Sequence, residues 1–213
     1  MKQETTKDKL YKGKGLIDTS LGIKIKDISY PFLLAMSKTK IKYKLVYDNQ
    51  LEKLEGHPCI FISNHYSFRD TPIVCNSIKE RAYILTGKQP LRPEDDLFFH
   101  FYGSVFVDRK DKEDMALSKL AMEAYLKKEI ANIVFPEGTW NSDPALLMLP
   151  MKWGIIETAQ KSNAQIIPMT LFYQRDKLEC HIQYGKPRLY PKGIDKKEAI
   201  NSVRDEMATM LWN

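Results

Sequence analysis

The feature that most constrains the fold is a series of short apolar runs separated by segments with helical periodicity. Compact apolar runs such as Cys59–Ile62 and Asn132–Phe135 are typical of buried strands. Longer segments such as Pro93–Tyr102 and Asp111–Glu129 place apolar residues at helical spacing between charges. Strands that alternate with helices along a chain predict an α/β fold with a mixed, largely parallel central sheet flanked by helices.

The same reading extends to the rest of the chain. Further predicted strands are Ile41–Tyr47, Ala82–Leu85, Ser104–Val107, Ile166–Tyr173 and Cys180–Tyr184, and further predicted helices are Pro72–Lys79, Met151–Lys161 and Lys196–Leu211. No Gly/Ser linker or internal repeat divides the 213 residues, a length that suits one domain. We therefore expect one folded domain over residues 41–213, preceded by an N-terminal arm over residues 1–40.

Charge distinguishes the arm from the domain. The whole chain carries a formal charge of +6, and residues 1–44 hold eleven Lys and four acidic residues, a balance of +7. The remainder therefore carries 6 − 7 = −1. A basic arm on a near-neutral body favours an anionic membrane surface as partner. The alternative is a solvated Lys-rich segment, and nucleic acid is not expected as a partner.

The sequence predicts peripheral rather than integral membrane attachment. The longest apolar run, Ile28–Met36, is much shorter than the roughly 20 residues of a spanning helix. We expect an amphipathic or loop contact with the membrane through Tyr30, Phe32, Leu33 and Leu34, or else these residues belong to an ordinary core.

The compartment expected from the sequence is the cytoplasm, with the protein on the inner face of the membrane. Charges and glycines fill the first 27 residues, where a secretory signal would be apolar. Cys59, Cys75 and Cys180 are odd in number and form no CxxC pair, which indicates reduced thiols.

His65 and Asp70 form the first candidate for chemistry. Five residues on one helix correspond to about 140° of rotation, so a continuous helix would point the two side chains apart. Thr71 is a candidate N-cap and Pro72 a candidate first helical residue, which leaves His65 on a loop that can fold back to Asp70. An Asp on one imidazole nitrogen leaves the other free to take a proton from a hydroxyl. The alternative is a histidine held by a carboxylate for structure alone.

Three further segments carry polar residues suited to binding a substrate. Phe135–Thr139 follows a predicted strand, and its Gly138 allows close approach of a ligand while Glu137 can accept hydrogen bonds from hydroxyls. Arg109 follows another strand and suits a phosphate, and Lys152 follows downstream and can join the same site. The alternatives are a strand-ending turn, an Arg paired with neighbouring acids and a solvated Lys.

These segments resemble the motifs of a known family. NHYSFRD begins at Asn64, GSVFVDR at Gly103, FPEGTWN at Phe135 and IIPM at Ile166. Their order and spacing resemble the glycerophospholipid acyltransferases, best known through the 1-acylglycerol-3-phosphate O-acyltransferases. The resemblance covers roughly residues 40–190, and the pairing of NHxSxxD with FPEGT is specific.

The resemblance implies a glycerol-3-phosphate acyltransferase-like fold, a function and a set of site residues. The implied reaction moves a fatty acyl group from acyl-CoA or acyl-carrier protein to a hydroxyl of a lysophospholipid such as 1-acylglycerol-3-phosphate, with no metal and no cofactor beyond the acyl donor. The implied site comprises catalytic His65 and Asp70, substrate-binding Arg109, Glu137, Gly138, Thr139 and Lys152, and loop-shaping Asn64 and Ser67.

One departure from the family pattern bears on the acceptor. The Arg usual after FPEGT is Trp140 here, and the usual Ser is Asn141. Trp cannot pair with a phosphate as a guanidinium does. Lys152 or Lys88 can replace the lost charge, or the acceptor differs from lysophosphatidic acid. A peripheral lipid-binding module without turnover is the remaining alternative.

Overall fold

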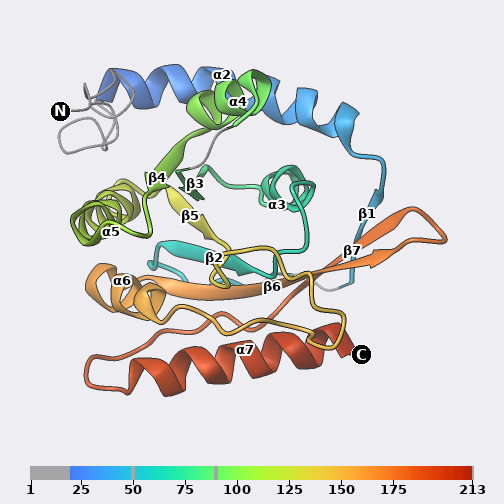
Figure 1. The fold of residues 1–213 in the computed structure, drawn as a ribbon. Coiled ribbons are helices and arrows are strands. Elements are labelled where there is room, and N and C mark those ends of the chain that lie inside the picture. Colours follow the sequence, from blue (N-terminus) through green and yellow to red (C-terminus); the bar gives the residue numbers. More distant parts are fainter. Residues whose placement is uncertain (1–19, 49–50, 89–90, 213) are drawn as a thin grey trace.

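The backbone of the computed structural model, which describes residues 20–48, 51–88 and 91–212, is organised around one twisted sheet (Figure 1). The strands of that sheet are β1 (Lys44–Tyr47), β2 (Cys59–Ser63), β3 (Ala82–Gly87), β4 (Ser104–Val107), β5 (Ala131–Val134), β6 (Gln165–Gln174) and β7 (Glu179–Tyr184). The described helices are α2 (Ser20–Lys40), α3 (Asp70–Ser77), α4 (Pro93–Tyr102), α5 (Lys112–Leu126), α6 (Gly154–Ser162) and α7 (Lys196–Trp212).

The sheet is mixed and mostly parallel, which confirms the predicted fold class. Its strand order is β1-β7-β6-β2-β5-β3-β4. Neighbouring strands are parallel except for the β6–β7 hairpin, whose pairing is antiparallel. The predicted strands and helices from residue 41 onward are confirmed to within a few residues at each end.

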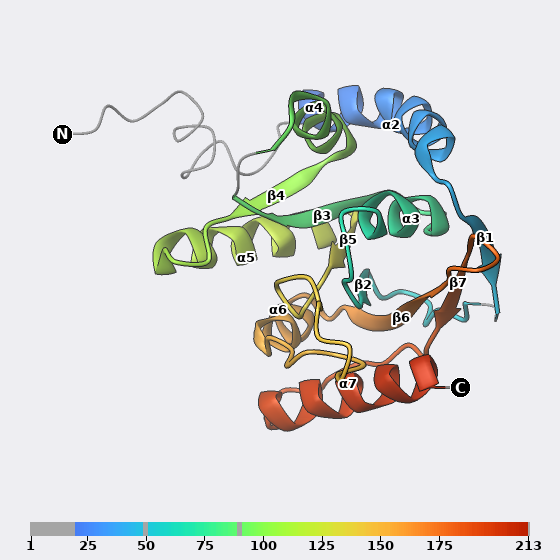
Figure 2. The same ribbon diagram turned by 45° about the vertical axis from the view of Figure 1, so that its right-hand side comes forward.

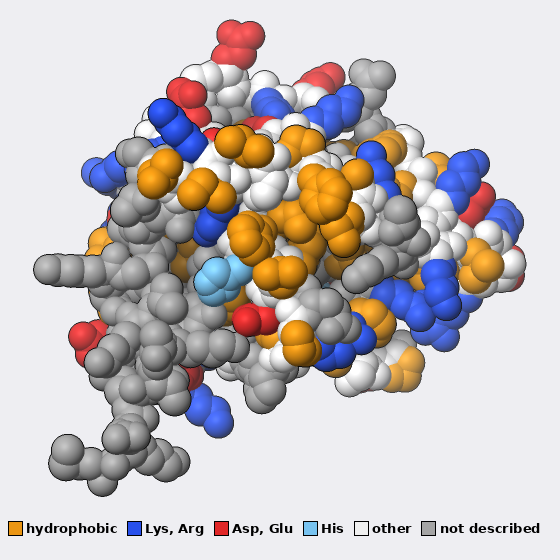
Figure 3. All heavy atoms as spheres, turned by 90° about the horizontal axis from the view of Figure 1, so that it is seen from above, with side chains coloured by type: hydrophobic (Ala, Val, Ile, Leu, Met, Phe, Trp, Pro, Cys, Tyr) orange, Lys and Arg blue, Asp and Glu red, His pale blue; other side chains and the backbone are white. Residues whose placement is uncertain are grey.

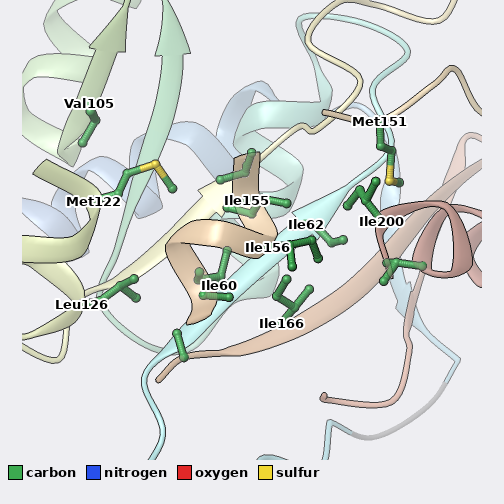
Figure 4. Packing of buried hydrophobic residues seen from close by; sticks show 14 of the residues in the cluster. Ile60, Ile62, Val105, Met122, Leu126, Met151, Ile155, Ile156, Ile166 and Ile200 are labelled. Carbon is green, nitrogen blue, oxygen red and sulfur yellow. The ribbon is translucent and has the colours of Figure 1, made fainter. Parts of the chain in front are cut away.

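Side chains alternate between the two faces of the sheet along each strand, so that a hydrophobic core forms on each face. In β2, Ile60 and Ile62 pack on one face with α5, α6 and α7, while Cys59 and Phe61 pack on the other face with α2, α3 and α4 (Figure 2). The close view in Figure 4 shows the first core, where Ile156 lies among the strand isoleucines. Because β2 is buried on both faces, its sequence reads as a continuous apolar run.

Helix α2 was not predicted from the sequence. Residues 20–40 form a helix despite Pro31 in its interior. Its Tyr30, Leu33 and Leu34 pack against the second core, to which α3 and α4 also contribute. Residues 1–19 of the expected arm lie outside the described residues. Within the described part of the chain, no helix is both long and apolar enough to cross a membrane.

Arg81 fastens α2 to the rest of the molecule. Its Nε donates to Asp27 of α2 at 2.8 Å, and its guanidinium lies 4.5 Å from the ring centre of Tyr30. A second guanidinium nitrogen donates to the carbonyl of Tyr102 at the end of α4. One side chain therefore connects α2, β3 and α4, so that residues 20–40 are part of the folded body.

The start of α3 differs from the prediction. The helix begins at Asp70, so Thr71 is not its N-cap. The N-cap position is occupied by Arg69, whose side chain makes no capping hydrogen bond. The reason is that the Asp70 carboxylate accepts hydrogen bonds from the backbone N–H groups of Tyr66 and Ser67 in the preceding loop. That carboxylate ties the loop to the first residue of the helix.

Candidate active site

The predicted site residues follow four strands that are neighbours in the sheet. His65 follows β2, Glu137 and Gly138 follow β5, Lys88 follows β3, and Arg109 follows β4. These strands are parallel, so their carboxyl ends lie at one edge of the sheet. Open α/β sheets place their ligand sites at this edge.

The structure brings His65 and Asp70 into direct contact. His65 Nδ1 lies 2.9 Å from Asp70 Oδ2. The imidazole stacks on Phe135, with ring centres 4.1 Å apart and planes inclined by 18°. Because the partner of Nδ1 is a carboxylate, Nδ1 carries the hydrogen and Nε2 is left as the basic nitrogen.

Asp70 is fully buried and surrounded by donors. Besides His65, its Oδ2 accepts from the backbone N–H groups of Tyr66 and Ser67. Its Oδ1 accepts from the hydroxyls of Ser67, at 3.3 Å, and Tyr173. Five donors on two oxygens hold the carboxylate in one orientation, which fixes the imidazole in turn.

Asn64 and Ser67 hold the loop in place. The Asn64 side chain donates to the carbonyl of Leu171 at 3.0 Å and accepts from its N–H at 2.8 Å, so it pairs with β6 as one more residue of a strand would. The Ser67 hydroxyl accepts from the N–H of Arg69 while it donates to Asp70. These contacts support the loop-shaping role expected of both residues.

Glu137 lies beneath the site rather than on its surface. The residue is buried, and its two oxygens accept from the N–H of His65 at 2.9 Å and of Leu149 at 2.8 Å. Burial raises the pKa of this carboxyl, while both backbone donors oppose that shift. Since both oxygens already bind backbone, Glu137 positions the His65 loop and does not line the cavity expected to hold the acceptor.

Arg109 lies across the ends of β3 and β5. Its guanidinium donates to the carbonyl of Gly138, and a Cβ on Gly87 or Gly138 would lie 3.7 Å from its central carbon. Gly138 has φ of +77°, a conformation that glycine adopts without strain. Desolvation lowers the pKa of Arg109, whose guanidinium stays charged at any physiological pH.

A cavity of about 1160 Å³ adjoins these residues. Its polar end is lined by His65, Arg109, Gly138 and Thr139, and by Arg69 at the start of α3. Its apolar walls come from α2 and α4 and include Phe32, Leu33, Met36, Leu97, Phe98 and Phe101. Figure 3 views the side that carries these two helices, where hydrophobic side chains gather with Lys and Arg around them. The volume is of the size that holds a small organic ligand or an acyl chain.

Trp140 stands where the family pattern has Arg. Its ring is half exposed and meets the His65 ring edge-on, with centres 6.2 Å apart. The next residue, Asn141, is buried, donates from its backbone N–H to the carbonyl of His65, and binds the carbonyl of Leu146 through its side chain. The pair therefore supplies an aromatic wall and a loop contact but no cation.

Neither lysine proposed as a replacement cation occupies that position. Lys88 Nζ pairs with the buried carboxylate of Asp114 at 2.8 Å. Lys152 is exposed to solvent and does not line the cavity, and its backbone N–H donates to the carbonyl of Pro136. The expectation that Lys152 or Lys88 restores the lost charge is thus not supported, because each side chain points to another environment.

Tyr173 is a site residue that the sequence reasoning missed. It lies on β6, four residues beyond Met169, which pairs with the last residue of β2. The signal was present in the alternation of Ile167, Met169 and Leu171, which all pack on the α3 side of the sheet. Extending that alternation by one step places Tyr173 on the side where α3 begins.

Several known proteins are similar to this chain. A family model described as Acyltransferase matches residues 45–171. A curated 1-acyl-sn-glycerol-3-phosphate acyltransferase from Saccharomyces cerevisiae is 32% identical over 124 residues, which cover 56% of this chain and 40% of the yeast protein. The human 1-acyl-sn-glycerol-3-phosphate acyltransferase beta is 26% identical over 117 residues, which cover 54% of this chain and 41% of that protein. The match therefore spans about 40% of the length of these curated relatives.

A solved structure shares the fold over most of its length. The crystal structure of the 1-acyl-sn-glycerophosphate (LPA) acyltransferase, PlsC, from Thermotoga maritima superposes with a TM-score of 0.67 and 19% identity, covering 89% of this chain and 80% of that chain. The overall fold is thus an architecture seen before.

Proposed function

Because the chain belongs to the acyltransferase family, we propose that it moves a fatty acyl group from a thioester donor, acyl-CoA or acyl-carrier protein, to a hydroxyl of a lysophospholipid such as 1-acylglycerol-3-phosphate. The observation that carries the proposal is the His65–Asp70 contact of 2.9 Å beside a large cavity. The imidazole is reachable from that cavity, whereas its partner carboxylate is buried.

The geometry supports a general-base reaction. His65 Nε2 takes the proton of the acceptor hydroxyl, and the oxygen attacks the thioester carbonyl carbon. The tetrahedral intermediate collapses as the C–S bond breaks, which leaves a new ester and a thiolate. The imidazolium returns its proton to that sulfur, so His65 ends neutral. Asp70 stabilises the imidazolium in between and stays an anion.

The cavity suits the two chemical halves of a lipid acceptor. Arg109 offers an exposed guanidinium for a phosphate next to His65. Aromatic and aliphatic side chains of α2 and α4 line the remainder and suit an acyl chain. Thr139 lines the polar end and can contact the glycerol part, whereas Glu137 and Lys152 act outside the cavity.

A second apolar face of α2 supports the proposal of membrane contact. Five side chains at helical spacing, Leu21, Ile25, Ile28, Phe32 and Met36, are each 46–80% exposed. They lie on the side of the helix opposite Tyr30, Leu33 and Leu34, which pack inward. Exposed Lys24, Lys38 and Lys42 accompany them. A lipid surface would cover this stripe and bring acceptor lipids to the cavity that α2 lines.

Thiol release and lipid products test the activity. The purified protein is given acyl-CoA or acyl-carrier protein with a panel of lysophospholipids, and products are read by mass spectrometry. We expect transfer to at least one acceptor and its loss in His65→Ala. Lipid binding without thiol release above the His65→Ala background would instead indicate a non-catalytic lipid-binding module.

A further inference from the structure

Asp70 has a hydrogen-bond partner that lies in none of the four motif segments. The Tyr173 hydroxyl donates to Asp70 Oδ1, the oxygen that does not face His65. Tyr173 belongs to β6, whereas Phe135 and Glu137 follow β5. These two strands flank β2 on opposite sides. The Asp70 carboxylate thus accepts a hydrogen bond from the sheet as well as those from its own loop.

The strand register explains how Tyr173 reaches the site. β6 pairs with β2 up to Ser63, and the Asn64 side chain prolongs that pairing to Leu171. β6 then continues past the end of β2 as part of the hairpin with β7, where Tyr173 pairs with Cys180. Tyr173 shares a face with Leu171, so it points toward the start of α3, where Asp70 lies.

The surroundings of Tyr173 keep its hydroxyl a donor. Its ring packs against Tyr43, with centres 5.2 Å apart, and faces Tyr66 at 6.4 Å. Burial first, and then the negative charge of Asp70, raise the pKa of the Tyr173 phenol. A phenol that keeps its proton can only donate to the Asp70 carboxylate.

We infer that Tyr173 is a positioning residue for the proposed acyl transfer. It orients Asp70 and weakens the interaction of the Asp70 carboxylate with the His65 imidazolium. The inference rests on the proposed function for its kinetic part only. A donor on Oδ1 draws negative charge away from Oδ2, so the imidazolium is stabilised less than by a bare carboxylate. Removal of that donor should therefore strengthen the pairing of the carboxylate with the imidazolium.

Other titratable and charged groups also face this pair. They are Tyr66 in the His65 loop, Glu137 after β5, Cys180 on β7, and Tyr43 with the Arg69 guanidinium 5.8 Å from its ring centre. Burial raises the pKa of Cys180 to about 12 and also raises that of Tyr66, so neither ionises near neutral pH. We expect Glu137 to keep its contacts in a Tyr173 variant. Its effect on the His65 titration is then the same in the variant and in the unmodified protein.

Tyr173→Phe removes the hydroxyl and little else. The titration of the His65 ring is followed by NMR in the variant and in the unmodified protein, with no substrate present. We expect the midpoint to move up by about half a pH unit, because the carboxylate holds the imidazolium more strongly. In acyl transfer, we expect kcat to fall about tenfold with KM for both substrates unchanged, and the acid limb of the rate profile to move up with the NMR midpoint.

Tyr184→Phe is the matched control. Tyr184 lies on β7, and its buried hydroxyl donates to the carbonyl of Ser77, away from Asp70. We expect that variant to lose stability without a change in the His65 titration or the pH profile. Identical titrations and rate profiles in Tyr173→Phe and the unmodified protein would overturn the inference. Absence of transfer in the unmodified protein would refute the proposed function instead, and the NMR comparison would still decide the role of Tyr173.

Discussion

At the scale of single residues, His65 and Asp70 differ in what each does for the protein. The imidazole lines the cavity and contacts Asp70 through Nδ1, whereas Asp70 accepts from five donors. His65→Ala is therefore expected to lower kcat by roughly 10²–10⁴ and to change the free energy of unfolding by under about 1 kcal/mol.

Asp70→Asn is expected to affect both quantities. An amide nitrogen would face donors that the carboxylate oxygens now accept, which leaves buried donors unsatisfied at a cost of about 1–3 kcal/mol. kcat should fall by roughly 10²–10⁴, because the imidazole loses its orientation. Denaturant unfolding and single-turnover rates measure the two effects. Full stability in Asp70→Asn would contradict the donor arrangement described above.

The acid side of the rate profile also belongs to this scale. The proposed base, His65, can accept a proton only when its imidazole is neutral, so transfer should fall as the solution becomes acidic. A rate that stays constant from about pH 5 to 8 would be inconsistent with that role.

Trp140 is the residue expected to influence the choice of acceptor most directly. Its ring stands beside His65 in the position where the family pattern carries a guanidinium. Trp140→Arg is expected to raise the kcat/KM for lysophosphatidic acid about tenfold relative to an uncharged acceptor, because a charged hydrogen bond to phosphate is gained. Trp212→Arg, on the exposed end of α7, is the control. Equal acceptor ratios in all three proteins would remove Trp140 from the account of specificity.

At the scale of secondary-structure elements, α5 and α6 are joined by a charged contact. Glu157 of α6 accepts from Lys119 of α5 at 2.8 Å, and Lys161 lies one turn on. The hydrogen bonds from these lysines lower the pKa of Glu157 to about 2. Because the folded pKa lies below the ordinary value of 4.5, the stabilisation is present above that pH and is lost as the pH falls toward 2.

Glu157→Gln tests this contact. The variant should be less stable by about 0.5–1 kcal/mol at pH 7, since the pair is partly exposed, and the difference should vanish near pH 2. Thermal unfolding at several pH values provides the comparison, with Glu52→Gln in an exposed loop as control. A difference that persists unchanged in acid would mean that the carboxylate charge is not its source.

The accuracy of the sequence reasoning varied between elements for physical reasons. Strands such as β2 and β5, buried on both faces, were predictable because burial leaves a continuous apolar run. Helix α2 was not, because apolar residues occupy two opposite faces and Pro31 interrupts it, so no single amphipathic stripe is visible. The limits of α3 were misjudged because a carboxylate that closes its own preceding loop has no distinctive sequence pattern.

The same distinction applies to the candidate site. The contact between His65 and Asp70 was predictable because it is local in sequence. The positions of Glu137 and Lys88 depend on partners from other segments, namely the His65 and Leu149 amides and the Asp114 carboxylate. Such long-range pairings are invisible to short-range reasoning, which is also why Tyr173 was missed.

At the scale of the whole molecule, the exposed stripe of α2 and the cavity beside it form one continuous surface. Phe32 and Met36 belong to both, since each is exposed and each lines the cavity. A lipid that leaves a bilayer at this surface would reach the His65 end of the cavity without crossing bulk water. Of the residues first expected at the membrane, Phe32 lies outward, whereas Tyr30, Leu33 and Leu34 pack inward.

Vesicle flotation tests the surface directly. Ile25→Ser, Ile28→Ser and Phe32→Ser are combined in one variant, and anionic vesicles are used at low and high salt. Each side chain is worth about 1.5–3 kcal/mol when fully buried, so partial insertion of three predicts at least about a tenfold fall in binding. The lysines beside the stripe should make the remaining binding weaker at high salt. Leu120 is an exposed residue of α5, on the opposite face of the sheet. Leu120→Ser should therefore bind vesicles like the unmodified protein. If the triple variant is folded and floats equally well, α2 is not the membrane face, and the lipid must reach His65 by another route.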